Sequence, residues 1–421
     1  MNRRVLLIIA FILIVIVFGA LIYFVFLRDL FGPDTNANNA NTPTNQVTNG
    51  VLPNTNSATN GVPVNGLTNV NRLVNIEPTT NINAGPDQIA QGGETLAGYV
   101  ASADAEGVST TPDGNGIRFY DRDQGLFFML DSLGTKVKLS EQLFPQAESI
   151  VWAPKSNKAI VTYPDQSKIV YDFDRQSQVT LPREWTDVAF NPNGDKLAFK
   201  NESTNTDDRW LAISNADGSQ VQGIEPLGDN GNNVDVNWSP TGQVVATYRE
   251  AQNASQQEVY LVGTQGENFK SIPTDGRGFE GTWSPDASQL LYSVYNADSR
   301  YNPVLYLVDA SGDSTGGNTV NLGLQTWSFK CAFAHGSPAA YCAVPRFLPD
   351  GSGIVPEVAT NTNDLIYRIN TDTGIRTLVA MPSLASGNEN YTVVNVVMSN
   401  DDRRLYFTDA NTGNIYSIQL Q

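Results

Sequence analysis

The sequence predicts an all-β fold, a β-propeller of seven four-stranded blades, with six or eight blades left open. A unit made of an apolar run, an aromatic residue, a polar turn and a second β-rich run recurs through the C-terminal three quarters of the chain. Alternating runs closed by Asp, Asn and Gly turns lie between the copies, and no helical period interrupts them after Gly93. The copies repeat every ~47 residues, a length typical of propeller blades.

The repeat is clearest in four copies, which read ESIVWAPKSNKAIVTY, TDVAFNPNGDKLAFK, VDVNWSPTGQVVATY and FEGTWSPDASQLLYS. Two weaker copies surround Phe333 and Met398, and a degenerate first copy contains Pro112. An aromatic residue recurs once in most units, so we expect these residues to pack between neighbouring blades rather than to form a sugar platform. They are Trp152, Phe190, Trp238, Trp283 and Phe333.

The last copy supplies three strands at most, ending with NIYSIQLQ. A ring of blades leaves no open edge only if its two ends interlock. We therefore expect a strand from within Gly93 to Asp104 to complete the final blade.

The units resemble the TolB-type propeller repeats, which are WD-repeat-like and carry an aromatic, Ser, Pro, Asp and Gly run before a short apolar strand. The resemblance is best at TWSPDASQLLYS and NWSPTGQVVATY and covers residues from about 110 onward. It implies a propeller. Family members carry an α/β domain before six blades, whereas this chain has an apolar N-terminal segment and seven units, so a role in the Tol system is not implied.

The N-terminal segment predicts a membrane anchor. Residues from Val5 to Leu27 carry no charge and, as a helix, would span roughly 35 Å, enough to cross a bilayer core. A cleavable signal peptide has an apolar core of only ~7–15 residues. Arg3 and Arg4 precede the span, so we expect residues 1–4 in the cytoplasm, a transmembrane helix at 5–27 and the remainder outside the cytoplasmic membrane.

A linker and one folded domain follow the anchor. Of the 59 residues from Gly32 to Ala90, 15 are Asn, and too few are apolar to offset the entropy of an ordered backbone. We expect a disordered tether at 28–92 and the propeller at 93–421. The formal net charge of −17 falls entirely after residue 90, which argues against nucleic acid as a partner.

The sequence identifies no catalytic centre, cofactor site or metal site. The chain has one histidine, His335, at a predicted tight turn, which excludes metal sites built on several histidines. A G-x-S-x-G match at Gly312–Gly316 contains Ser314, but no helix follows it as a nucleophile elbow requires. The Asp-rich turns lack the spacing of a twelve-residue calcium loop and fit ordinary turn chemistry.

Cys331 and Cys342 are the two cysteines of the chain. If their hairpin turns at Gly336 and Ser337, the two residues face each other and a cross-strand disulfide is reasonable. A register slip of one residue would instead leave two buried thiols on opposite faces, and the sequence leaves this alternative open.

These observations favour a non-catalytic binding or scaffold module for a protein or glycan partner. We expect its contact surface on the two longest excursions between strands, at 296–303 and 343–363, which contain Arg300, Tyr301 and Arg346. The alternatives are a carbohydrate-acting hydrolase or lyase with carboxylates at the channel mouth, and a structural component of the cell surface.

Overall fold

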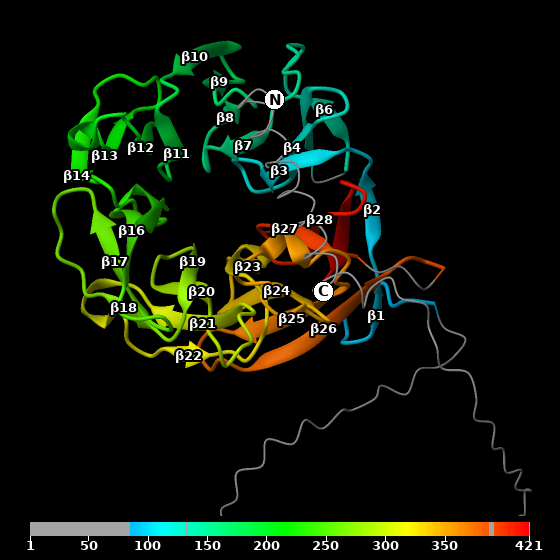
Figure 1. The fold of residues 1–421 in the computed structure, drawn as a ribbon. Coiled ribbons are helices and arrows are strands. Elements are labelled where there is room, and N and C mark those ends of the chain that lie inside the picture. Colours follow the sequence, from blue (N-terminus) through cyan, green and yellow to red (C-terminus); the bar gives the residue numbers. More distant parts are fainter. Residues whose placement is uncertain (1–84, 132–133, 387–390, 421) are drawn as a thin grey trace, which may run out of the picture. The chain divides into compact units, whose positions relative to one another are not determined.

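The computed structural model describes residues 85–131, 134–386 and 391–420, which form a ring of seven β-sheets (Figure 1). The predicted all-β propeller with seven blades is confirmed. The transmembrane helix expected at 5–27 and most of the expected linker lie outside the described residues. Within the described part of the chain, no helix has the length and apolar character needed to cross a bilayer.

Five blades are built from four consecutive antiparallel strands each, the first strand innermost and the fourth at the rim. Blade 1 contains β3 (Ala105–Thr110), β4 (Ile117–Asp121), β5 (Leu126–Leu130) and β6 (Lys136–Lys138). Blade 2 contains β7 (Ser149–Trp152), β8 (Lys158–Thr162), β9 (Lys168–Asp172) and β10 (Ser177–Leu181). Blade 3 contains β11 (Trp185–Phe190), β12 (Lys196–Asn201), β13 (Trp210–Asn215) and β14 (Gln222–Pro226).

Blades 4 and 5 follow the same order. Blade 4 contains β15 (Val234–Val236), β16 (Val244–Ala251), β17 (Gln257–Gly263) and β18 (Ile272–Thr274). Blade 5 contains β19 (Arg277–Trp283), β20 (Gln289–Tyr295), β21 (Val304–Asp309) and β22 (Val320–Asn321). Short 3-10 turns occur at η2 (Thr206–Asp208), η3 (Gly231–Asn233), η4 (Gly312–Ser314), η5 (Ser328–Lys330) and η6 (Pro356–Val358).

The last two blades recruit strands from the N-terminal side of the propeller. Blade 7 contains β27 (Val393–Met398), β28 (Arg404–Asp409) and β29 (Ile415–Gln419), and β2 (Gly98–Ala101) completes it antiparallel to β29. The expected closing strand is thereby confirmed. Blade 6 contains β23 (Cys331–Phe333), β24 (Ala339–Pro345), β25 (Asp364–Asn370) and β26 (Arg376–Ser383). It gains a fifth strand, β1 (Glu94–Leu96), which runs parallel to β26 and was not predicted.

The innermost strands of blades 1, 3, 5 and 7 share a local irregularity. In each, the register with the second strand shifts near its start. A left-handed residue lies inside each shifted stretch: Gly107, Asp187, Gly278 and Asn395. Glycine adopts this conformation freely, and Asp and Asn tolerate it better than other side chains, which explains the residue types. Bulges of this kind bend the strand locally and change the direction of the side chains beside them.

The core is divided among the interfaces between neighbouring blades. The recurring aromatics Trp152, Phe190, Trp283 and Phe333 are buried in four different apolar clusters, as the repeat predicted, and Trp238 is half-buried. Each cluster combines side chains of two adjacent blades, so every blade depends on its neighbours for burial.

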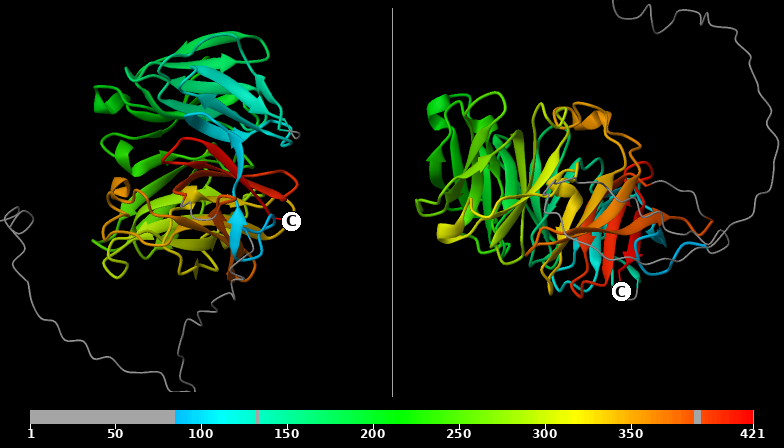
Figure 2. Two further views of the ribbon diagram at one scale, coloured as in Figure 1. Left: turned by 90° about the vertical axis from the view of Figure 1, so that its right-hand side faces the viewer. Right: turned by 90° about the horizontal axis from the view of Figure 1, so that it is seen from below.

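The two faces of the ring differ in their connections. Tight turns between first and second strands lie on one face, which we name the turn face. Connections between second and third strands lie on the opposite face, which we name the loop face. Figure 2 (right) shows an orange turn from the connection between β24 and β25 projecting beyond the sheets.

Candidate functional site

Two long connections on the loop face bond to each other. They are residues 296–303 of blade 5 and 346–363 of blade 6; the second was expected from residue 343, but β24 continues to Pro345. The amide of Gly351 donates to the carbonyl oxygen of Arg300 (2.9 Å), and that of Gly353 donates to Tyr301 (2.8 Å). The two connections therefore form one continuous surface.

Buried hydrogen bonds beneath the solvent surface hold the two connections together. The amide of Ser352 donates to the side-chain oxygen of Asn302 (3.2 Å), whose side-chain nitrogen reaches the carbonyl oxygen of Leu348 at 3.5 Å. All three residues are buried. Buried polar groups that are hydrogen-bonded resist rearrangement, so the surface above them is held in one shape.

The first connection also contains two consecutive left-handed residues. Arg300 has φ 54° and Tyr301 has φ 58°, which costs an L side chain roughly 1 kcal/mol or more per residue. The amide of Tyr301 donates to the carbonyl oxygen of Asn296 (2.8 Å), and that of Arg300 donates to Ala297 (3.0 Å). These bonds and the junction hold a backbone conformation that the residues would not adopt alone.

Large apolar side chains gather at the solvent surface of the two connections. We name them the apolar loop surface; their exposed fractions range from 45% for Val358 to 72% for Phe347. The surface consists of Tyr301, Phe347, Ile354, Val355 and Val358. Five large apolar side chains on two joined loops are more than the scattered apolar residues of an ordinary surface.

The three residues expected to bind a partner lie here. Arg300, Tyr301 and Arg346 are all exposed, and an Arg300 guanidinium nitrogen lies 3.8 Å from Asp350 Oδ1. Their role in binding stays a prediction. Sequence reasoning missed Phe347 and the aliphatic residues after it, although the apolar letters in RFLPDGSGIVPEV lie outside any strand period and could have indicated them.

A second group of charged residues lies on the innermost strands of blades 3, 4 and 5. Asp187, Asp235 and Glu280 each stand three residues before the recurring aromatic of their blade. Lys200 Nζ lies 3.6 Å from Asp187 Oδ2, and Arg249 Nε lies 3.2 Å from Asp235 Oδ2. A cavity of about 410 Å³ contains Asp235, Glu280 and Arg249.

The cavity raises the pKa of both carboxyl groups. Burial raises the pKa of Glu280 to about 6, and the charge of Asp235 adds to this effect while Arg249 opposes it. Burial also raises the pKa of Asp235, which Arg249 opposes. Glu280 touches water but is enclosed by protein on several sides, so its charge loses much of the stabilisation that bulk water gives. Within residues 85–131, 134–386 and 391–420, no three His, Cys, Asp or Glu side chains cluster as a metal site needs.

A second cavity, of about 570 Å³, lies on the turn face between blades 5 and 6, and both Ser314 and His335 line it. Sequence reasoning gave these two residues no special relation. Ser314 Oγ donates to the carbonyl oxygen of Ser311 (2.6 Å), and His335 Nδ1 lies 3.4 Å from Asp402 Oδ1. Because each side chain engages a different neighbour, the arrangement lacks the nucleophile–base bond of a hydrolase.

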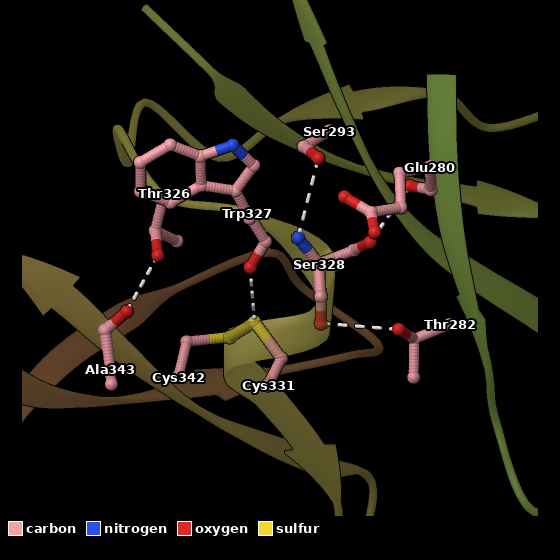
Figure 3. The surroundings of a disulfide bond; sticks show 9 residues. All are labelled: Glu280, Thr282, Ser293, Thr326, Trp327, Ser328, Cys331, Cys342 and Ala343. Atoms are coloured by element: carbon pink, nitrogen blue, oxygen red, sulfur yellow. Dashed lines mark hydrogen bonds between the residues drawn. A yellow bond between two sulfur atoms is a disulfide. The ribbon is translucent and has the colours of Figure 1, made fainter. Parts of the chain in front are cut away.

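Cys331 and Cys342 face each other on β23 and β24 and are joined by a disulfide (Figure 3). The segment before β23 is bonded to blade 5: Ser328 Oγ donates to the carbonyl oxygen of Glu280 (2.8 Å), and Thr282 Oγ1 donates to that of Ser328 (3.1 Å). Both sulfur-bearing residues are buried. The disulfide is therefore a buried bond that joins the first two strands of blade 6, next to the interface with blade 5.

No family model matches this sequence, and a search of curated proteins gives no match. Among solved structures, the Cps50 (Swd1) β-propeller domain of Myceliophteria thermophila is similar with a TM-score of 0.51 and 11% identity, over 77% of this chain and 100% of that one. An oligogalacturonate lyase in complex with manganese is similar with a TM-score of 0.48 and 14% identity, over 77% and 90% of the two chains.

TolB from Acinetobacter baumannii is similar with a TM-score of 0.42 and 14% identity, over 66% of each chain. At identities this low, a structural likeness extends to the fold and not to an activity. The comparisons therefore agree with the repeats on one conclusion: the described part of this chain is a β-propeller.

Proposed function

We propose that this chain is a non-catalytic, membrane-anchored binding module that docks a protein partner through the apolar loop surface. The observation that carries the proposal is the pair of hydrogen-bonded connections that hold five large apolar side chains in solvent. A rigid surface loses little conformational entropy on binding, and exposed apolar side chains gain from burial against a partner.

The chemistry of the surface favours a protein over a glycan. Ile354, Val355 and Val358 offer branched aliphatic groups, which make no hydrogen bonds to sugar hydroxyls and no flat stacking contact. Phe347 and Tyr301 add aromatic area of the kind that anchors protein interfaces. Arg300 and Arg346 beside them supply a polar rim that can pair with carboxylates of the partner.

The anchor completes the proposal. The uncharged segment at 5–27 and the basic residues before it support a single span with the propeller outside the cytoplasm. The polar, Asn-rich stretch at 28–92 supports a flexible tether between them. In this arrangement the module searches the volume near the membrane for its partner.

Crosslinking on intact cells, followed by mass spectrometry of the products, tests the proposal. We expect one reproducible protein partner with the wild-type chain and its loss in the Phe347→Ser and Ile354→Ser variants. Ile375→Ser is the matched control, because Ile375 is a similarly exposed isoleucine at a turn-face connection of the same blade. Partner capture that survives both loop substitutions would refute the docking surface, and crosslinks only between copies would indicate a surface lattice.

The two carboxyl groups that line the cavity between blades 4 and 5, those of Asp235 and Glu280, give a second candidate function. Glu280, with its pKa raised to about 6, is suited to donate a proton in glycoside cleavage, and Asp235 lies in the same cavity. If the chain is such an enzyme, Glu280→Gln abolishes cleavage of an oligosaccharide substrate and Phe347→Ser leaves it intact. Absence of turnover across an oligosaccharide panel with the wild-type chain would eliminate this candidate.

A further inference from the structure

A cleft lies between blades 7 and 1, where the ring closes. Cavities of about 360 Å³ and about 420 Å³ share Arg404, Tyr406 and Gln419 in their walls, so they adjoin each other on one face of blade 7. We name the two together the closure cleft. Its combined size falls in the range that proteins use for small-molecule ligands, roughly 300–1,000 Å³.

The wall from blade 7 is one face of its sheet. Arg404 lies opposite Gln419, and Tyr406 lies opposite Ser417, which in turn faces Gly98 of the closing strand. Side chains on neighbouring strands at paired positions point to the same side of a sheet. Arg404, Tyr406 and Ser417 therefore line the cleft together. Tyr99 pairs instead with Tyr416, and its ring packs against the Tyr416 ring on the other side of the sheet, with centroids 5.9 Å apart.

The opposite wall belongs to blade 1 and contributes few charges. The β3–β4 turn contributes Gly114 and Asn115, and the end of β5 contributes Leu130 and Asp131. Asp131 is the carboxylate that blade 1 places in the cleft. Asp131 Oδ1 accepts a hydrogen bond from the amide of Thr135 (2.8 Å). Part of the hydrogen-bonding capacity of the Asp131 carboxylate is therefore used within its own turn.

Two exposed arginines of the cleft, Arg403 and Arg404, form no direct ion pair among the described residues, although, besides the hydrogen bond from Ser399, the charge of Arg403 contributes to lowering the pKa of Asp401. Within the described residues, the side chains of Arg403 and Arg404 form neither an ion pair nor a hydrogen bond. The nearby carboxylate of Asp401 is engaged inside its own turn, where it accepts from Ser399 Oγ (2.6 Å) and from the amide of Arg403 (3.2 Å). The two adjacent guanidinium groups place positive charge at the cleft in a domain that carries the whole net charge of −17.

Tyr406 supplies an independent observation. It is 8% exposed and lines both parts of the cleft, yet its hydroxyl has no hydrogen-bond partner among the described residues. Solvent reaches this hydroxyl, because it is not among the fully buried polar atoms that lack a partner, so a ligand in the cleft could replace its water.

We propose that the closure cleft binds a sugar carboxylate, such as a uronic acid unit. The guanidinium of Arg404 pairs with the carboxylate in a bidentate geometry. The Tyr406 and Ser417 hydroxyls bond to sugar hydroxyls. An inorganic anion would use the arginines alone and would leave the tyrosine and serine groups unused.

Binding of D-glucuronate to the solubilised full-length chain tests this inference, with ligand-observed NMR titration as the readout. We expect saturable binding at low ionic strength, weakened at least ~10-fold by Arg404→Gln and ~3- to 10-fold by Tyr406→Phe. Arg175→Gln is the control, because Arg175 is an exposed arginine of blade 2 that lines neither part of the cleft, and its loss should leave affinity unchanged. D-glucose, which lacks the carboxylate, should bind no better than glucuronate binds to Arg404→Gln.

Three results would overturn the inference: no saturation by ~10 mM glucuronate, affinity unchanged in Arg404→Gln, or equal binding of inorganic phosphate that Tyr406→Phe does not affect. The last would identify a simple anion site. Phe347→Ser should bind glucuronate normally, so this inference and the proposed docking surface succeed or fail separately. Equal melting temperatures of all variants would show that lost binding is not lost folding.

Discussion

At the scale of single residues, the ion pair of Lys330 and Asp364 is the feature with the largest consequence for stability. Lys330 Nζ lies 2.7 Å from Asp364 Oδ1, and the exposed fractions of the two side chains are 4% and 0%. Asp364 Oδ2 also accepts from the amide of Val393 in blade 7 (2.7 Å). The pair therefore bonds blade 6 internally and joins it to blade 7.

Replacing Lys330 with methionine leaves a buried carboxylate without its cation, so we expect Lys330→Met to lower the free energy of unfolding by about 3–5 kcal/mol. Lys138→Met, which removes a solvent-exposed ion pair with Glu141, should change it by no more than about 0.5 kcal/mol. Denaturant unfolding of the two variants measures the difference. Equal effects would mean that Asp364 finds another partner or becomes protonated at little cost.

The raised pKa of Glu280 predicts that this residue makes the fold less stable as the pH rises, whereas most carboxylates make a fold more stable as the pH rises. Burial raises this pKa from 4.5 to about 6, so folding favours the protonated form. Ionised Glu280 therefore destabilises the fold above pH 6, and the penalty disappears as the pH falls toward 4.5. Glu280→Gln should raise the melting temperature at pH 7.5, on the order of 1 °C, and should have no effect at pH 4.5.

Glu225→Gln, on the exposed rim strand β14, provides the matched comparison for thermal melts at both pH values. If Glu280→Gln raised the melting temperature equally at pH 7.5 and pH 4.5, the raised pKa of Glu280 would be contradicted. The neutral amide would then act through packing and not through the loss of a charge.

At the scale of elements, the β23–β24 hairpin shows how far a sequence argument reaches. A turn at Gly336 and Ser337 places Cys331 opposite Cys342, and the structure has this register, whereas the sequence alone left a slip of one residue open. The hydrogen bonds between Ser328 and blade 5, by contrast, could not be predicted from any pattern in the sequence. They join residues about 50 positions apart, whose nearness depends on the ring itself.

The disulfide closes a short loop, with a sequence separation of 11, so it restricts the unfolded chain only moderately. We expect the Cys331→Ala/Cys342→Ala double variant to lose roughly 2–3 kcal/mol of stability. Alkylation of the denatured wild-type chain without reductant should leave its mass unchanged. Addition of two alkyl groups would show that the thiols are free in the isolated protein.

At the scale of the whole molecule, the seven blades could be predicted because each repeats the same short pattern. The weak first and last copies still form blades, since Thr110 and Met398 occupy the positions that Trp and Phe hold elsewhere. Strand β1 could not be predicted: Glu94–Leu96 is three residues long and pairs with β26, which lies about 290 positions further along the chain. The apolar loop surface was located only in part, because a loop has no period that marks its exposed side chains.

Closure makes the N-terminal strands essential to the ring. Deleting residues 91–104 removes β1 and β2, leaves β29 as an open edge and uncovers Ile415 beneath it. We expect a fall in melting temperature of roughly 10 °C or more, together with a greater tendency to aggregate. An unchanged melt in differential scanning calorimetry would mean that the other strands close the ring unaided.

The same arrangement decides how the molecule responds to mechanical tension. The chain preceding residue 85 continues directly into β1 and β2, so a pull on it loads the rim of blades 6 and 7 before any other part of the ring. The three residues of β1 that pair with β26 would separate first under tension. Strand β2 would remain paired with β29 and would keep the ring of blades closed. Single-molecule extension should accordingly show a small early release of length before the ring opens.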